Sequence, residues 1–141
     1  MIGKYLVDSN VLIYALDTSE KEKHEKAKQF MVKASYEKGA RLSVQNLAEF
    51  YVNITGKRKG IALPSEIATQ RLAEFSEVFR IIKYGKKTVI EAAYLQAEHK
   101  IHFWDSLLAA TMIENGIKTI YTENTKDFSK VPGIKAINPV Q

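Results

Sequence analysis

The sequence predicts an α/β fold in which helices cover both faces of a mainly parallel sheet. Short apolar runs alternate with longer amphipathic stretches along the chain, and polar side chains directly follow several of the apolar runs. Strands that alternate with helices form parallel sheets, because each connecting helix packs on a face of the sheet. No repeat or linker interrupts the 141 residues. We therefore expect one domain over residues 1–141.

The N-terminal part of the chain is expected to form a strand followed by two helices. The apolar run 5–7 is the length of a buried strand, and residues 11–16 continue apolar as a short helix. Residues 20–38 keep apolar side chains at helical spacing within a charged stretch, which indicates an amphipathic helix. Ser19 and Glu22 have the spacing of a capping box at its start.

The middle of the chain repeats the alternation of strand and helix. We expect Gly39 to end the preceding helix, residues 41–44 to form a strand and residues 45–55 to form a helix. Pro64 then opens a further helix, because proline is favoured in the first turn. Residues 78–82 are expected to be the third strand.

The C-terminal part contains two more helices and two more strands. Residues 87–100 are expected to form a helix with Val89, Ile90, Ala93 and Leu95 on its apolar side. Residues 104–115 form the next helix, which Gly116 ends. Strands are expected at 119–122 and 134–137.

Composition and charge narrow the function classes. The chain has no cysteine, which excludes disulfides and thiolate metal sites. Asp8, Ser9 and Asn10 interrupt the N-terminal apolar run, so it is too short and too polar to span a membrane. We expect a soluble, cytoplasmic protein without a membrane partner. The formal net charge of +5 favours a polyanionic partner, although the lysines are spread along the chain.

Acidic residues occur at positions that suit a binding site. Asp8 and Glu123 follow predicted strands, and parallel sheets bind ligands at the carboxyl ends of their strands. Each acid also has a structural explanation. Asp8 and Asp105 could cap helices, Glu49 could be a solvated helix charge, and residues 122–127 could form a polar turn. Clustered carboxylates repel one another unless a cation neutralises them, and Mg²⁺ or Mn²⁺ suits an all-oxygen site.

Three segments, in this order, resemble the motifs of the PIN-domain family, and in particular its VapC-type toxins. They are YLVDSNVLIYAL, LSVQNLAEFYVNIT and FWDSLLAATMIENGIKTIYTEN. The resemblance implies a PIN-like three-layer α/β/α sandwich and an Mg²⁺- or Mn²⁺-dependent endoribonuclease. Asp8, Glu49 and Asp105 would bind the metal and activate water for attack on RNA. The resemblance also implies a homodimer and a cognate VapB-like antitoxin.

One departure from the family pattern concerns the fourth acidic position. The family often has an acid directly after the strand expected here at 119–122, where the present sequence has Asn124 preceded by Glu123. We predict that Glu123 supplies the charge as a catalytic and metal-binding residue, and that Asn124 contacts the metal through its neutral oxygen. Asp127 is an alternative source of charge. The residues expected to support the metal ligands by hydrogen bonding are Ser9, Asn10, Ser43, Thr122 and Asp127.

Other polar and aromatic residues were assigned weaker roles. Lys57, Arg58 and Lys59 form the densest basic cluster, which is either a solvated loop or a contact for RNA phosphates. Lys83, Lys86 and Lys87 raise the same question. The three histidines have no ligand spacing. The aromatic residues Tyr14, Phe50, Tyr51 and Trp104 are expected in the core or in a dimer contact rather than as platforms for bases.

Three alternatives to the toxin ribonuclease were considered. The first is a PIN-like nucleic-acid-binding module with weak or no catalysis, which the departure at Asn124 suggests. The second is a PIN nuclease of RNA maturation or of structured DNA, outside any toxin pair. The third is a phosphatase with Asp8 as the nucleophile, which is disfavoured because Asn10 stands where a second aspartate is needed.

Overall fold

A five-stranded sheet forms the centre of the computed structural model, which describes residues 3–56 and 61–141. The strand order is β3-β2-β1-β4-β5, and every neighbouring pair is parallel. This confirms the predicted fold class. The strands are β1 (Tyr5–Val7), β2 (Ala40–Ser43), β3 (Arg80–Ile82), β4 (Thr119–Tyr121) and β5 (Lys135–Ile137).

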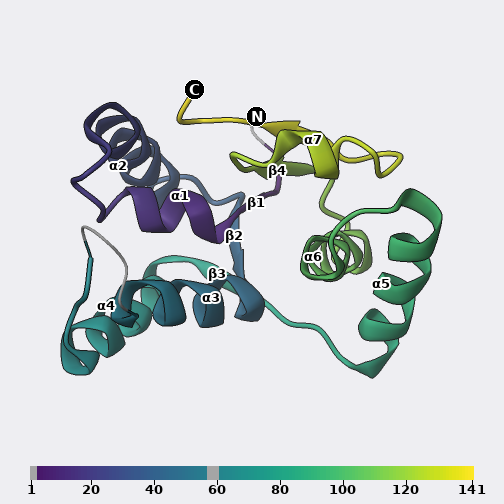
Figure 1. Cartoon of the computed structure of the whole chain (residues 1–141), viewed down its shortest axis with the longest axis horizontal. Helices are drawn as coiled ribbons and strands as arrows, with labels where there is room; N and C mark the ends of the chain where they lie inside the picture. Colours follow the sequence, from purple (N-terminus) through teal and green to yellow (C-terminus); the bar gives the residue numbers. More distant parts are fainter. Residues whose placement is uncertain (1–2, 57–60) are drawn as a thin grey trace.

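Helices cover the sheet on both faces and complete a three-layer arrangement. In Figure 1, α1 to α4 lie on one side of the strands and α6 on the other, with α5 packed outside α6. The helices are α1 (Ser9–Tyr14), α2 (Lys21–Ser35), α3 (Val44–Thr55), α4 (Ser65–Val78), α5 (Lys86–His99), α6 (Phe103–Glu114) and α7 (Thr125–Phe128). The short α7 is the one helix that was not predicted.

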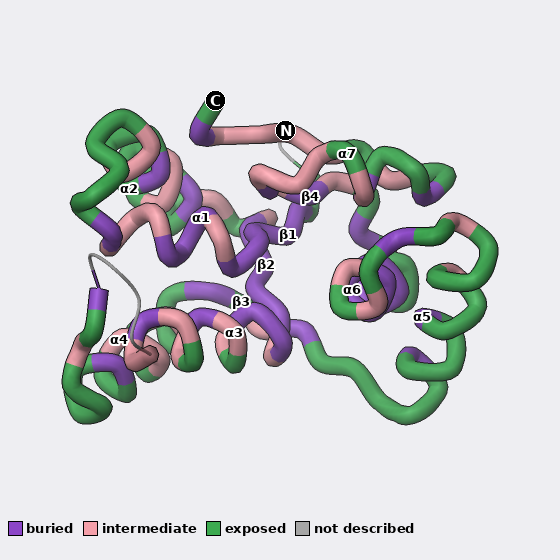
Figure 2. The backbone as a smooth tube through the Cα atoms, in the orientation of Figure 1, coloured by how far each residue is buried: buried purple, intermediate pink, exposed green. Residues whose placement is uncertain are grey.

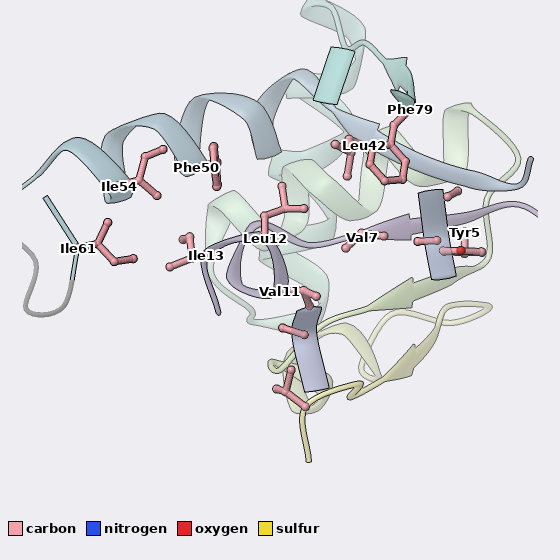
Figure 3. Packing of buried hydrophobic residues seen from close by; sticks show 14 of the residues in the cluster. Tyr5, Val7, Val11, Leu12, Ile13, Leu42, Phe50, Ile54, Ile61 and Phe79 are labelled. Carbon is pink, nitrogen blue, oxygen red and sulfur yellow. The ribbon is translucent and has the colours of Figure 1, made fainter. Parts of the chain in front are cut away.

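Alternation along the central strand separates two hydrophobic cores. Tyr5 and Val7 belong to the core beneath α1 to α4, which Figure 3 shows with Leu12 and Phe50. Leu6 belongs to the core beneath α6. Successive side chains of a strand point to opposite faces, so a strand of three residues contributes to both layers. Burial in both layers is what makes the apolar run at 5–7 continuous.

Helix α5 differs most from the expected burial. Figure 2 shows it largely exposed, whereas α6 is buried over most of its length, from Ser106 to Met112. Thr88 and Ala92 are its buried residues, while Val89 and Ile90 are exposed. Of the apolar residues expected on this helix, Leu95 is partly buried against the core, whereas the expected burial of Val89 and Ile90 was wrong. Helix α5 packs on α6 rather than on the sheet, so a narrow strip of small residues is enough for the contact.

The boundaries of α2 also differ from prediction. The helix begins after Glu20, which makes no side-chain capping bond. The expected capping box of Ser19 is absent, because the Ser19 hydroxyl donates to Oδ1 of Asp17 at 2.6 Å instead. The helix ends at Ser35, before Gly39. Gly39 serves a close approach of the chain to itself, since a Cβ there would lie 2.2 Å from the carbonyl oxygen of Gly3.

Two further findings bear on the expectations above. Gly116 ends α6 as predicted and has a positive φ of 68°, which glycine adopts without strain. Within residues 3–56 and 61–141, no helix is long and apolar enough to cross a membrane. The basic cluster Lys57, Arg58 and Lys59 lies outside the described residues.

Candidate active site

The candidate site begins at the carboxyl ends of β1 and β4. The register pairs Val7 with Tyr121, so the residues that follow them, Asp8 and Thr122, come side by side. The Thr122 hydroxyl donates a 2.7 Å hydrogen bond to Oδ2 of Asp8. The order of the strands along the chain changes direction between β1 and β4. Parallel α/β sheets bind their ligands at such a point.

Asp8 is buried, with 6% of its surface exposed. Its Oδ1 accepts a 2.7 Å hydrogen bond from the backbone N–H of Ser9, and in this way it caps α1. Asp8 therefore caps a helix, as the structural explanation for this residue predicted. Its Oδ2, however, faces Thr122 and the amide of Asn10, which lies 3.4 Å away. Capping uses one oxygen of Asp8 and leaves the second in a polar cluster.

Asn46 is a member of this cluster that the sequence analysis missed. It is fully buried, and its Nδ2 lies 3.4 Å from Oδ1 of Asp8. Asn46 and Ser43 form a reciprocal capping box at the start of α3. Ser43 therefore supports Asp8 through Asn46 rather than directly. The available signal was a serine followed three residues later by a side chain able to complete the box.

Glu49 approaches Asp8 from helix α3. It lies one turn after Asn46, and its Oε1 accepts a 3.0 Å hydrogen bond from the hydroxyl of Ser9. Ser9 is thus hydrogen-bonded to both acids, because its backbone N–H donates to Asp8. The supporting role predicted for Ser9 agrees with these contacts. Glu49 also has the amide of Gln45 at 3.4 Å from its Oε2.

Asp105 approaches from helix α6, on the other face of the sheet. The Asn124 amide nitrogen donates to Oδ2 of Asp105 at 2.7 Å and lies 3.3 Å from Oδ2 of Asp127. An amide nitrogen cannot ligate a cation, so this arrangement differs from the predicted metal contact through the Asn124 oxygen. Asn124 instead links two carboxylates that would otherwise repel each other. Asp127 lies in α7, the helix that the sequence analysis did not predict.

Glu123 does not join the other acids. Its carboxylate forms a 2.6 Å ion pair with Lys23 of α2 and accepts a 2.8 Å hydrogen bond from the hydroxyl of Tyr14. Burial alone would raise the pKa of Glu123, but the bonds to Lys23 and Tyr14 outweigh it and lower this pKa. The predicted role of Glu123 as a metal ligand is therefore at odds with this geometry. Adjacent side chains near the end of β4 point in different directions, so Asn124 faces the site in its place.

Burial and neighbouring negative charge make the ionised form of Asp8 unfavourable. Burial raises the pKa of Asp8 to about 6, and the hydrogen bond from Thr122 opposes this change. The charges of Glu49 and Asp105 raise the pKa further. Acids from three separate elements therefore interact electrostatically at one edge of the sheet.

The pKa of Asp105 is raised in a similar way. Burial raises its pKa to about 6, and the charges of Asp127 and Glu49 add to that effect. The neighbouring His102 and the hydrogen bond from Asn124 act in the opposite direction.

The donor set suits a hard divalent cation. Mg²⁺ and Mn²⁺ prefer carboxylate oxygens, and a cation would relieve the repulsion that raises the pKa of both Asp8 and Asp105. Among the described residues, no three acidic or histidine side chains stand close enough together to form a ready-made metal site. The residues therefore fit a cation by their chemistry and by their mutual repulsion.

Comparison with known proteins identifies the family. The PIN domain matches residues 5–134 of the chain. The chain belongs to the PIN-domain family. The family resemblance of the three sequence motifs is thereby confirmed. The match covers β1 through α7 and includes each of the acids described above.

Solved structures of toxin and toxin–antitoxin proteins have the same fold. A toxin–antitoxin complex from Klebsiella pneumoniae is 24% identical, with a TM-score of 0.68 over 96% of this chain and 98% of that one. VapBC2 from Rickettsia felis, bound to a DNA fragment from its promoter, is 22% identical, with a TM-score of 0.67 over 95% and 97%. VapC20 of Mycobacterium tuberculosis, a toxin that cleaves the sarcin–ricin loop, is 20% identical, with a TM-score of 0.68 over 89% and 94%. No curated protein sequence matches the chain.

Proposed function

We propose that this PIN domain is a divalent-metal-dependent endoribonuclease and the toxin of a VapBC-type toxin–antitoxin pair. The observation that carries the proposal is the convergence of acidic charge from β1, α3 and α6. Asp8 interacts electrostatically with both Glu49 and Asp105, although the three lie far apart in the sequence. Buried acids whose charges raise the pKa of one another are common at sites that bind a cation or carry out a reaction.

Asp8, Glu49 and Asp105 are the residues that would hold Mg²⁺ or Mn²⁺. When bound, the cation would offset their charge, lower the pKa of a water and stabilise negative charge on a phosphodiester. Ser9 would keep Glu49 oriented beside Asp8, through its 3.0 Å hydrogen bond to Glu49. Thr122 would orient Asp8 from the other side.

Asp127 is the residue we propose as the fourth acid. It raises the pKa of Asp105, and its Oδ2 lies 3.3 Å from the amide nitrogen of Asn124. Asn124 would link Asp105 and Asp127 through its amide without adding charge. Glu123 is engaged with Lys23 and would contribute to the rim of the site rather than to the cation.

The proposed partners are RNA, a VapB-like antitoxin and a second copy of the chain. An apolar hollow of about 290 Å³ between α2 and α4, lined by Val32 and Val78 among others, suits an apolar segment of an antitoxin. The exposed side chains Ile90 and Tyr94 on α5 suit a contact between two copies. We propose that the domain acts in the cytoplasm, where its RNA substrates are found.

The experiment that tests the function is a cleavage assay on labelled RNAs and single-stranded DNAs. The protein is assayed with Mg²⁺ or Mn²⁺ and with EDTA, beside Glu49→Gln and Asp105→Asn. We expect RNA cleavage that requires metal and falls by at least about a hundredfold in both variants. Cleavage that persists in EDTA would overturn the dependence on metal. Cleavage that persists in both variants would remove the acids from the chemistry.

A second candidate function is a nucleic-acid-binding module without catalysis. It is favoured by the amide of Asn124, which satisfies Asp105 and Asp127 without a cation. Calorimetric titration with Mn²⁺ separates the two. RNA binding without any metal binding or cleavage would establish the binding module in place of the nuclease.

A further inference from the structure

An open cavity of about 490 Å³ lies next to the proposed catalytic acids. It is formed by one side of α3, by Trp104 at the start of α6 and by Tyr84 before α5. Glu49 lines the cavity as well as facing Asp8 through Ser9. The cavity therefore shares Glu49 with the proposed catalytic site. Its volume falls in the range of pockets that hold small organic ligands.

Gln45 provides a polar group in a cavity whose lining is otherwise mostly apolar. It is 6% exposed, and its Nε2 donates a 2.8 Å hydrogen bond to the backbone oxygen of Trp104. Its Oε1 has no hydrogen-bond partner, and no other buried side-chain nitrogen or oxygen in residues 3–56 and 61–141 lacks one. An unpartnered buried acceptor is costly. Gln45 therefore offers an acceptor that a ligand with an N–H group would satisfy.

Two exposed aromatic side chains border the same cavity. Trp104 is 53% exposed and Tyr84 is 39% exposed. Of the two places expected for Trp104, the core is therefore wrong, and the dimer contact stays a prediction. Exposed aromatic rings beside a nucleic-acid site commonly stack on bases. The exposed lysines Lys83, Lys86 and Lys87 flank Tyr84 in the sequence. Lysines this close in sequence to a lining residue provide positive charge that complements a phosphate backbone.

We propose that this cavity binds one unpaired nucleobase of the RNA strand, next to the phosphodiester at the acids. Trp104 would stack on the face of the base, and Oε1 of Gln45 would accept a hydrogen bond from its exocyclic amino group. Adenine, cytosine and guanine each carry such an amino group. This inference rests on the proposed function for its substrate, although the binding of the base does not require cleavage.

A base explains the cavity better than a second copy of the chain does. Apolar contact between copies would account for Trp104 and Val52, which are both exposed. It would not account for the unpartnered acceptor of Gln45, which lines the cavity together with the proposed metal ligand Glu49.

Fluorescence of Trp104 tests the proposal directly, because it is the one tryptophan in the sequence. The full chain in EDTA is titrated with a short single-stranded RNA and with the same strand made abasic at every position. We expect the RNA to quench the fluorescence and the abasic strand to leave it unchanged. A third strand replaces each adenine by purine, which lacks only the amino group. It should bind about fivefold more weakly, since it loses one hydrogen bond.

Variants provide a second arm, read by anisotropy of labelled RNA. Trp104→Ala should weaken binding about tenfold, because base stacking is lost, whereas Trp104→Phe should stay within about twofold of the wild type. The matched control is Tyr36→Ala, which removes an aromatic side chain that is 86% exposed and lies at the end of α2. It should not change binding.

The outcomes separate the base subsite from the nuclease. Base-dependent quenching without metal-dependent cleavage would keep the subsite and overturn the nuclease. Cleavage with no quenching, and with equal KM in Trp104→Ala, would overturn the subsite and keep the nuclease. Fluorescence that changes on dilution of the protein but not with RNA would mean that a second copy fills the cavity. Equal affinity for the adenine and purine strands would remove the role of Gln45.

Discussion

The hydroxyl of Thr122 donates a 2.7 Å hydrogen bond to Oδ2 of Asp8, across 114 positions of the sequence. The bond exists because β1 and β4 are parallel neighbours whose ends are in register. Thr122 also accepts from the backbone N–H of Asn124 at 3.0 Å. Thr122 therefore connects Asp8 to Asn124, whose amide in turn contacts Asp105 and Asp127.

Replacement of this threonine should damage both stability and catalysis. Thr122→Val keeps the size of the side chain but removes the bond to Asp8 and leaves the N–H of Asn124 without its acceptor. We expect a loss of about 1–3 kcal/mol in the free energy of unfolding and weaker metal-dependent cleavage. Chemical denaturation and the cleavage assay measure these effects. Thr122→Ser, which keeps the hydroxyl, should recover most of both, and a Val variant as stable and active as the wild type would contradict the prediction.

The metal-free protein should become less stable as pH rises from about 4 to about 7. Burial, with the nearby acids, raises the pKa of Asp8 to about 6, while an unfolded aspartate titrates near 3.9. The folded state thus binds more protons in this window. The stability is fully present below the unfolded pKa and is lost as pH rises through the folded pKa. Asp8 should account for about 1–3 kcal/mol of the change.

Denaturation in EDTA across this pH range measures the effect. Asp8→Asn, which cannot ionise, should show a flatter profile than the wild type. Addition of Mg²⁺ at pH 7 should restore stability to the wild type but not to Asp8→Asn. Equal slopes for the two proteins would show that the ionisation of Asp8 is not the cause.

A matched pair of variants identifies the fourth acid. Asp127→Asn should reduce cleavage by about tenfold or more, because it removes a negative charge beside Asp105. Glu123→Gln should leave cleavage within about twofold, because its carboxylate is bound to Lys23 rather than turned to the site. Single-turnover cleavage rates at saturating Mn²⁺ compare them. The reverse order would restore the role that the sequence assigned to Glu123.

A change of Asn124 to aspartate should make the site more dependent on metal. Asn124→Asp replaces the donor to Asp105 by a third negative charge and should lower metal-free stability by about 1–3 kcal/mol. The rise in melting temperature on addition of Mn²⁺ should become larger than in the wild type. Asn124→Ala serves as the control, because it also loses the donor but gains no charge. An identical response of the two variants would exclude a ligand role for an acid at this position.

Most of the fold could be predicted from the sequence, because its signals are local. The apolar run at 5–7, the helix stop at Gly116 and the alternation of strands and helices each depend on a few neighbouring residues. The errors arose where tertiary contact decides. Val89 and Ile90 are apolar and were expected to pack, but α5 packs on α6 through Thr88 and Ala92, which are buried in their place.

The sequence by itself determined the family, the fold class and the acids Asp8, Glu49 and Asp105 as candidates, since motif order and strand-end positions are properties of the chain. Only the tertiary structure decided which polar groups support them. It brought Asn46 to Asp8 and turned Asn124 rather than Glu123 toward Asp105. The direction of a side chain beyond a strand end depends on partners from distant elements, such as Lys23 of α2. Those partners are defined only when the layers pack together.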